Sequence, residues 1–334
     1  MTATSTPPAR ARPGRRRADR SPVATAPGPD TGTTADTALR YRPELDGVRA
    51  IAVYLVVAYH AGMSGVPGGF LGVDLFFVLS GFLVTGVILR ETDRRGTFSL
   101  GGFYARRVRR LLPAAVLVVV VTSLVQLLLT SQATRVGLVG DARAALLYVA
   151  NWHFVADSRD YFAQADDPSP FLHFWSLAIE EQFYLAFPLL VLAVLRWAPR
   201  PVRALAVAVA VVGAVSLGLQ LLRAGDDATY AYYATDTRVY QLAAGVALTL
   251  VVRRLRGRRV EARLARVATP AAVVGLAGLL VLASPAADLD PSARGIGATV
   301  AAVLLLGGLW LAPRGPLARV LALPAPRWLL LTLT

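Results

Sequence analysis

An arginine and a histidine stand eleven residues apart within one apolar segment of the sequence, at Arg49 and His60. In a helix this spacing spans about 16 Å along the axis, which reaches from one surface of a bilayer to near its middle. Ionisable side chains at such depth are costly, so they indicate function. The pair predicts chemistry inside a membrane, with a charge at one end and a proton acceptor at the other.

His60 is one of only three histidines, and His153 and His173 are the others. A neutral imidazole is well suited to take a proton near neutral pH, so we assign His60 as a catalytic base. A hydrogen-bonded core residue is the alternative for any single histidine. The three together could also hold a metal ion, but their spacing matches no ligand motif and we expect no metal.

A second stretch whose residues could take part in catalysis runs from His173 to Tyr184. It contains two adjacent carboxylates, Glu180 and Glu181. On a helix they point about 100° apart, so they cannot both face one pocket. We expect one of them to orient His60 or the substrate while the other pairs structurally. The alternative is an interfacial role for both, with Trp175 and Tyr184 as belt aromatics.

Four arginines cluster before the third apolar segment, at Arg106, Arg107, Arg109 and Arg110. Arginines three residues apart share a helix face, which pairs Arg106 with Arg109 and Arg107 with Arg110. Such a face suits bidentate binding of phosphate. The alternative is that these charges only mark a cytoplasmic loop.

Other polar residues lie within apolar segments and need partners there. Asp74 stands near the outer end of the second segment, and Asp236 and Arg238 near the outer start of the sixth. They either form ion pairs or hold a polar substrate. We assign to the candidate substrate site the following residues: Asp74, Ser80, His173, Trp175, Asp236 and Arg238.

The composition indicates an all-α, polytopic bundle of transmembrane helices. The 334 residues are 55% hydrophobic with a net charge of +14, and several apolar runs approach or exceed the length that spans a bilayer. Every basic residue is arginine and there is no cysteine, which excludes a catalytic lysine and a thiol nucleophile. The arginines lie between apolar segments, as cytoplasmic loops require, so we expect no nucleic-acid partner.

The pattern of apolar segments predicts the topology. Residues 1–40 form a disordered, basic, cytoplasmic tail, and 41–334 form the transmembrane domain. We expect 131–173 to be external or re-entrant and 328–334 to be a stub too short to cross. We expect eight complete spans, at about 48–64, 70–89, 111–130, 174–195, 204–222, 231–252, 267–284 and 294–312.

Four motifs in order resemble those of the acyltransferase-3 family of integral membrane acyltransferases, which includes polysaccharide O-acetyltransferases. The resemblance covers about 41–252 well, and 253–320 only by alternating spans. The four matching stretches run from Glu44 to His60, Asp74 to Phe82, Arg106 to Pro113 and Phe174 to Tyr184.

The resemblance implies transfer of an acyl group, usually acetyl, from cytoplasmic acyl-CoA to a hydroxyl. The acceptor would be a carbohydrate of an envelope polysaccharide, peptidoglycan, glycolipid or glycoside, and the location the cell membrane, among lipid. Acyl-CoA would be a co-substrate, not a permanent cofactor. The family's arginine–histidine motif falls on Arg49 and His60, and its paired-arginine motif on Arg107 and Arg110. We expect the phosphates of the acyl donor to be bound by the cytoplasmic arginines, namely Arg49, Arg106, Arg107, Arg109 and Arg110. His60 would act as the base or carry the acyl group itself.

The end of the chain departs from the family pattern, which normally continues through further spans. Since the sequence stops at Thr334, it predicts a truncated member. An inactive truncated member is one alternative function. A transporter of a polar or lipid-linked solute is another, against which the lack of an inverted repeat counts. Oligomeric state and acyl length stay open.

Overall fold

Eight long helices dominate the part of the chain that the structure describes. This computed structural model describes residues 1–3, 42–129, 132–158, 161–162 and 169–324, apart from the side chains of 132–136. The long helices are α1 (Pro43–His60), α2 (Gly72–Arg95), α3 (Leu100–Leu129), α6 (Phe174–Trp197), α7 (Pro201–Arg223), α9 (Thr235–Leu255), α10 (Arg259–Ala283) and α11 (Pro291–Leu311). The short ones are η2 (Gly69–Leu71), α4 (Gln132–Leu146), α5 (Ala150–Ala156), α8 (Ala228–Tyr233) and α12 (Pro316–Leu321). No strand occurs among these residues, so the all-α prediction is confirmed.

The long helices coincide with the eight predicted spans. Within the described residues, six are long and apolar enough to cross a membrane, namely α2 together with η2, α3, α6, α7, α10 and α11. Helices α1 and α9 have 18 and 21 residues but carry charged residues, among them Arg49 and Arg238, that lower their apolar character. The chain is therefore a multi-pass membrane protein.

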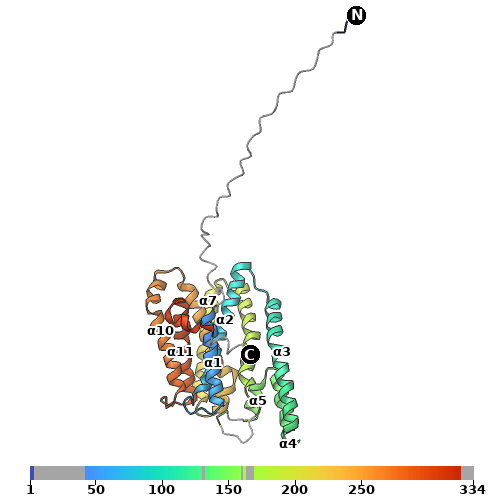
Figure 1. Cartoon of the computed structure of the whole chain (residues 1–334), viewed down its shortest axis with the longest axis vertical. Helices are drawn as coiled ribbons and strands as arrows, with labels where there is room; N and C mark the ends of the chain where they lie inside the picture. The colour runs from blue at the N-terminus through green and yellow to red at the C-terminus, as the bar shows by residue number, and fades with distance from the viewer. Residues whose placement is uncertain (4–41, 130–131, 159–160, 163–168, 325–334) are drawn as a thin grey trace, which may run out of the picture. The chain divides into compact units, whose positions relative to one another are not determined.

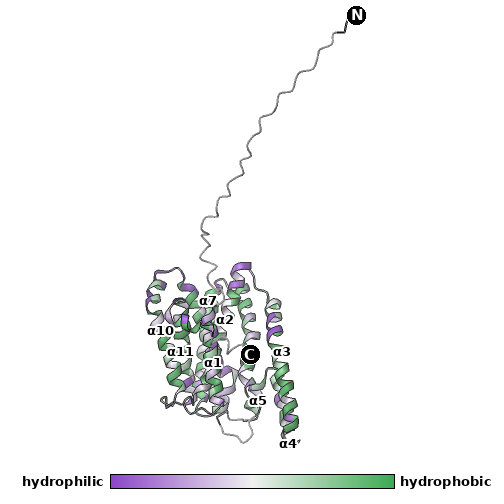
Figure 2. Cartoon of the chain, viewed as in Figure 1, coloured by the Kyte–Doolittle hydropathy of each residue, from purple (hydrophilic) through white to green (hydrophobic). Residues whose placement is uncertain are grey.

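Helix α3 has a mostly exposed apolar surface. Only 11% of its most apolar stretch is buried, and hydrophobic residues cover much of the helix in Figure 2. Leu117 and Leu128, for example, are 63% and 86% exposed. Exposing apolar side chains of this kind to water is unfavourable, whereas lipid tails solvate them well. This surface of α3 is therefore suited to a bilayer.

Helices α2 and α9 pack closely through glycine. A Cβ atom on Gly81 would overlap the backbone of Leu242, and one on Gly245 would overlap the backbone at Val78. Small residues allow helix backbones to approach in this way. The close contact joins the helix that carries Asp74 and Ser80 to the helix that carries Arg238. Helices α10 and α11 pack against one another beside this pair (Figure 1).

The segment predicted to be external or re-entrant contains two short helices. Helices α4 and α5 have 15 and 7 residues, so each is shorter than the roughly 20 residues that span a bilayer. The chain turns between them at Tyr148, whose φ of 55° is left-handed. Helix α4 contacts α3 and α5, and α5 contacts α6 and α8. The predictions for 4–40 and for the 328–334 stub lie outside the described residues.

Candidate active site

His60 is the last residue of α1, and its ring is held in one orientation. Nδ1 lies 2.8 Å from the carbonyl oxygen of Val56. Because a carbonyl only accepts hydrogen bonds, Nδ1 carries the proton of the neutral ring and Nε2 keeps its lone pair. The hydroxyl of Tyr161 lies 3.2 Å from Nε2 and donates to it. His60 as a residue is exposed.

His173 lies immediately before α6 and interacts electrostatically with His60. The residue is exposed, although the surrounding protein removes part of the water from its imidazole. Burial lowers the pKa of His173, the neighbouring His60 lowers it further, and a hydrogen bond at the Pro170 backbone opposes both effects. His173 is therefore mainly neutral at pH 7. The structure brings this predicted substrate residue close enough to His60 for the two imidazoles to interact.

Tyr161 is the centre of an aromatic cluster beside the two histidines. Its ring stacks on Tyr232 at 4.5 Å and on Tyr59 at 6.0 Å, and it meets Trp175 edge-on at 6.1 Å. Burial raises the pKa of Tyr161, so its hydroxyl stays protonated and remains a donor. Trp175 is 1% exposed, which places this predicted substrate residue in the core that supports the His60 site.

A second polar cluster joins α2 to α6. The Ser80 hydroxyl donates to Oε1 of Glu180 at 2.5 Å, and the Tyr184 hydroxyl donates to Ser80 at 2.9 Å. The guanidinium of Arg107 lies 4.0 Å from the centre of the Tyr184 ring. Glu180 thus bonds Ser80, while the backbone of Val56 orients His60.

The two adjacent glutamates have different surroundings, as their spacing predicts. Glu180 accepts from Ser80, whereas Oε1 of Glu181 is buried and has no hydrogen-bond partner among the described residues. Leaving a buried acceptor unsatisfied is costly. Glu181 is therefore the member of the pair with a buried carboxylate oxygen that lacks a hydrogen-bond partner among the described residues.

The arginines assigned to the acyl donor divide into two groups. Arg49 donates to Asp46 at 2.8 Å, and both Arg49 and Arg107 lie close enough to Glu180 to interact electrostatically. The remaining three are exposed and lie on α3, at Arg106, Arg109 and Arg110. Arg106 forms an ion pair with Glu91 at 3.1 Å. A guanidinium within the bundle and others at its surface would suit a long, phosphate-bearing ligand.

Asp74 and Arg238 form a buried ion pair between α2 and α9. Arg238 donates to Oδ1 of Asp74 at 2.6 Å, and each side chain is 1% exposed. Gln241 donates to the same oxygen. Asp236 accepts from the Tyr230 hydroxyl at 2.8 Å. Mutual pairing and burial favour the ion-pair interpretation of Asp74 and Arg238 over direct substrate contact.

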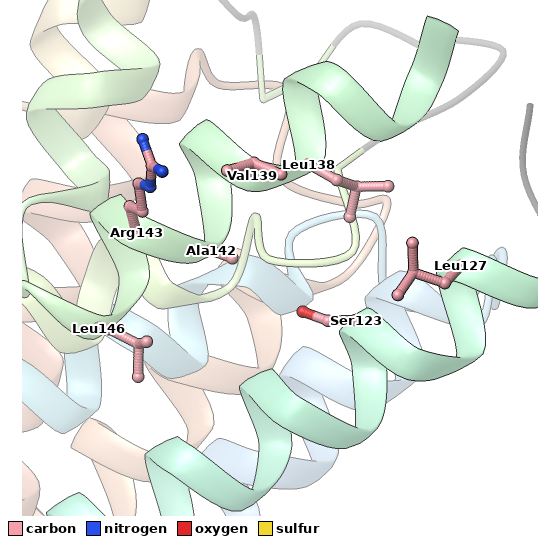
Figure 3. Close-up of a pocket in the computed structure, with 7 residues that line it drawn as sticks. All are labelled: Ser123, Leu127, Leu138, Val139, Ala142, Arg143 and Leu146. Carbon is pink, nitrogen blue, oxygen red and sulfur yellow. The ribbon is translucent and has the colours of Figure 1, made fainter. Parts of the chain in front are cut away.

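Two cavities lie away from the predicted residues. One of about 210 Å³ lies between α3 and α4, with Ser123 on one side and Arg143 on the other (Figure 3). Another of about 400 Å³ lies among α7, α9 and α11. Both are lined mainly by apolar side chains, and none of the residues assigned from the sequence lines either of them.

Comparison with known proteins determines the family. The Acyl_transf_3 family, described as an acyltransferase domain, matches residues 42–329, which include every residue of both polar clusters. The chain belongs to this acyltransferase family. The resemblance drawn from the four sequence motifs is thereby confirmed.

Curated relatives of this acyltransferase chain include proteins named for O-acetyl transfer. It is 40% identical over 213 residues to the peptidoglycan O-acetyltransferase OatA of Listeria monocytogenes. This aligned region covers 64% of this chain and 34% of the relative. It is also 40% identical over 228 residues to the Bacillus subtilis protein named "Putative peptidoglycan O-acetyltransferase YrhL", covering 67% and 36%. The chain spans about a third of the length of these relatives. No solved structure matches it.

Sequence reasoning did not assign Tyr161 to the candidate site. Its hydroxyl contacts His60 from a position 101 residues further along the chain. No motif or periodicity marks this tyrosine, so only the fold reveals the contact. The contact with Val56 was also not predictable from the sequence. Every helical residue has a carbonyl oxygen, and the sequence does not tell which of them accepts a hydrogen bond from a side chain.

Proposed function

We propose that this acyltransferase moves an acetyl group from acyl-CoA to a hydroxyl of a cell-envelope glycan, with His60 as the base. The observation that carries the proposal is the oriented ring of His60. Its Nδ1 is bound to the Val56 carbonyl at 2.8 Å, and its Nε2 accepts from the Tyr161 hydroxyl at 3.2 Å. In the proposed reaction the acceptor hydroxyl takes the place of the tyrosine hydroxyl at Nε2. A hydroxyl is a weak nucleophile until such a base takes its proton.

The reaction proceeds by transfer of one acyl group and one proton. His60 Nε2 accepts the proton of the acceptor hydroxyl as its oxygen attacks the thioester carbonyl. The new carbon–oxygen bond forms and the carbon–sulfur bond breaks. The proton held by His60 passes to the departing sulfur, which leaves as the CoA thiol. His173, whose pKa burial lowers, adds no competing positive charge beside the base at pH 7.

The donor end of the proposal rests on Arg49 and the α3 arginines. Guanidinium groups bind phosphate by paired, charge-assisted hydrogen bonds, and CoA carries phosphates at one end of a long, slender arm. Arg49 stands about 16 Å from His60 along α1 by helix geometry. We infer that the phosphates bind at the cytoplasmic side, with the pantetheine arm reaching toward His60.

The acceptor end rests on the relatives. Two of them are named for peptidoglycan O-acetylation. We therefore propose a carbohydrate acceptor of the cell envelope, with peptidoglycan as the first glycan to test.

The experiment measures transfer of labelled acetyl from acetyl-CoA to glycan in membranes that contain the protein. Replacing His60 with alanine should lower kcat by about 100- to 10,000-fold, the usual contribution of a general base. Asp226→Asn, at an exposed position after α7, is the matched control and should keep full activity. Each variant is first shown to accumulate in the membrane. Undiminished transfer by His60→Ala would refute the mechanism.

A further inference from the structure

The cavity of about 400 Å³ among α7, α9 and α11 lies apart from the residues used in the proposed reaction. Three of its α7 residues are exposed, at Ala206, Ala210 and Ala214, so it opens to the surroundings of the bundle, and we call it the α7–α9 groove. Small residues form much of its wall. Such an apolar space in a membrane protein needs an apolar occupant, because an empty one forfeits contacts with its lining.

Helices α7 and α9 run antiparallel along the groove, and two contacts define their register. The Ser216 hydroxyl accepts from the backbone N–H of Tyr240 at 3.0 Å. A Cβ atom at Gly213 would lie 3.3 Å from the Cβ of Ala243. The beginning of α7 therefore lies beside the end of α9, at one and the same end of the groove.

The length of the groove fits one lipid chain. Its lining on α7 extends from Ala206 to Leu217, and on α9 from Tyr240 to Val251. Each stretch spans about 16 Å along its helix axis. This is about half of the roughly 30 Å hydrocarbon core of a bilayer, which is the depth of a single leaflet.

Two guanidinium groups lie at the end of the groove where α7 begins and α9 ends. Arg203 stands three residues before Ala206, and Arg254 three residues after Val251, so each continues the face of its helix that lines the groove. Both arginines are exposed. In the part of the chain that the structure describes, neither guanidinium has an ion pair or a hydrogen bond.

An anionic phospholipid matches both parts of this surface. Guanidinium groups bind phosphate by charge-assisted hydrogen bonds, and the groove offers an apolar wall to an acyl chain. A second copy of this chain matches less well. In a symmetric pair the same surface meets itself, which would bring Arg203 and Arg254 of both copies to one membrane depth, where like charges repel.

We propose that the α7–α9 groove binds one anionic phospholipid, with its phosphate at Arg203 and Arg254 and one acyl chain along the groove toward Tyr240. The bound chain would fill the space among α7, α9 and α11. It would thereby support α9, which carries Arg238 of the buried ion pair. The site is independent of the acyl-CoA and the glycan proposed above.

The test is binding of phosphatidylglycerol to the full chain, purified in detergent and freed of copurifying lipid. Native mass spectrometry should show one saturable molecule per chain, bound at least about tenfold more tightly than phosphatidylcholine with the same acyl chains. Combining Arg203→Gln with Arg254→Gln should abolish this preference, because the charge-assisted hydrogen bonds are lost. Arg263→Gln, at an exposed position of α10, is the matched control and should keep it.

A second pair of variants tests the acyl chain. Ala210→Phe should fill the groove and weaken binding of both lipids by about tenfold or more. Val211→Phe, at an exposed position of α7 outside the groove, should leave binding unchanged. Phosphatidylglycerol should also raise the thermal unfolding midpoint of the wild type, since a ligand bound only by the folded state stabilises it, and not that of Ala210→Phe.

Three results would overturn the proposal. The first is equal binding of the two lipids by the wild type, as expected of lipids that merely surround the protein. The second is binding that neither the paired arginine substitutions nor Ala210→Phe changes. The third is a shift from dimer to monomer in Ala210→Phe with unchanged lipid binding, which would assign the groove to a second copy of the chain.

Discussion

At the scale of single residues, His173 interacts electrostatically with His60. Burial lowers the pKa of His173 below its ordinary value of 6.5, and His60 lowers it further. A positive charge on His173 would repel a second positive charge on His60 during proton transfer. A neutral His173 would therefore favour the proposed proton transfer to His60.

The lowered pKa of His173 predicts a loss of stability in acid. Its unfolded form takes up a proton as the pH falls through about 6.5, whereas the folded form resists, so folding is penalised below that value. The stabilisation is complete above about pH 6.5 and is lost as the pH falls through the folded pKa. We expect the thermal unfolding midpoint to be lower at about pH 5.5 than at about pH 7.5.

His173→Gln provides the comparison for this pH effect, because glutamine keeps hydrogen-bonding capacity but does not titrate in this range. The drop in unfolding midpoint between the two pH values should be smaller in this variant than in the wild type. An equal drop in both proteins would assign the acid sensitivity to other groups.

At the scale of helices, glycine determines how closely α2 and α9 approach. Gly81→Ala should destabilise the folded protein by about 1–3 kcal/mol, the usual cost of an added methyl group in a packed interface. The reason is that a Cβ atom at Gly81 overlaps the Leu242 backbone. The measurement is the thermal unfolding midpoint in detergent, monitored by the loss of monodisperse protein on heating.

Gly218→Ala is the matched control for this helix contact. Gly218 also lies within a long helix, α7, but nothing stands within 4 Å of a Cβ atom placed there. This change should be neutral or slightly stabilising, because alanine favours helix. Equal destabilisation by both changes would mean that helix packing at Gly81 is not the cause.

The positions of the helices were predictable, whereas their partners were not. Long apolar runs bounded by arginine revealed all eight long helices, because burial in lipid requires a helix of a certain length. The pairing of Ser80 with Glu180 joins residues 100 positions apart, and periodicity says nothing about contacts of that range. The break at Tyr148 was hidden because the apolar character of the sequence continues through it.

The same limit applies within the candidate site. Residue types made His60 and the arginine cluster candidates, since few side chains accept protons or bind phosphate. The assignments of Asp74 and Arg238 to substrate rested on the cost of charge in a membrane. That cost is equally met by their mutual ion pair, so the sequence could not decide between the two roles.

At the scale of the whole molecule, the proposed donor and acceptor ends lie at different depths. Arg49 and His60 occupy opposite parts of α1, so an acyl group carried on CoA would enter from one side and leave from the other. A transporter would move a solute without acyl-CoA, whereas this arrangement predicts that transfer requires acyl-CoA on one side only. The sidedness of the reaction therefore distinguishes the two functions.

Sealed vesicles of defined orientation test this sidedness. Labelled acetyl-CoA added outside should be used by inside-out vesicles and not by right-side-out ones, because charged CoA does not cross lipid. In inside-out vesicles Arg110→Ala should raise the KM for acetyl-CoA by about tenfold, the cost of one charge-assisted hydrogen bond, while His60→Ala should lower kcat. If the donor and acceptor ends are separate, one substitution can weaken donor binding while another removes activation of the acceptor. Equal use of acetyl-CoA from both sides, or the same kinetic change in both variants, would therefore contradict separate ends.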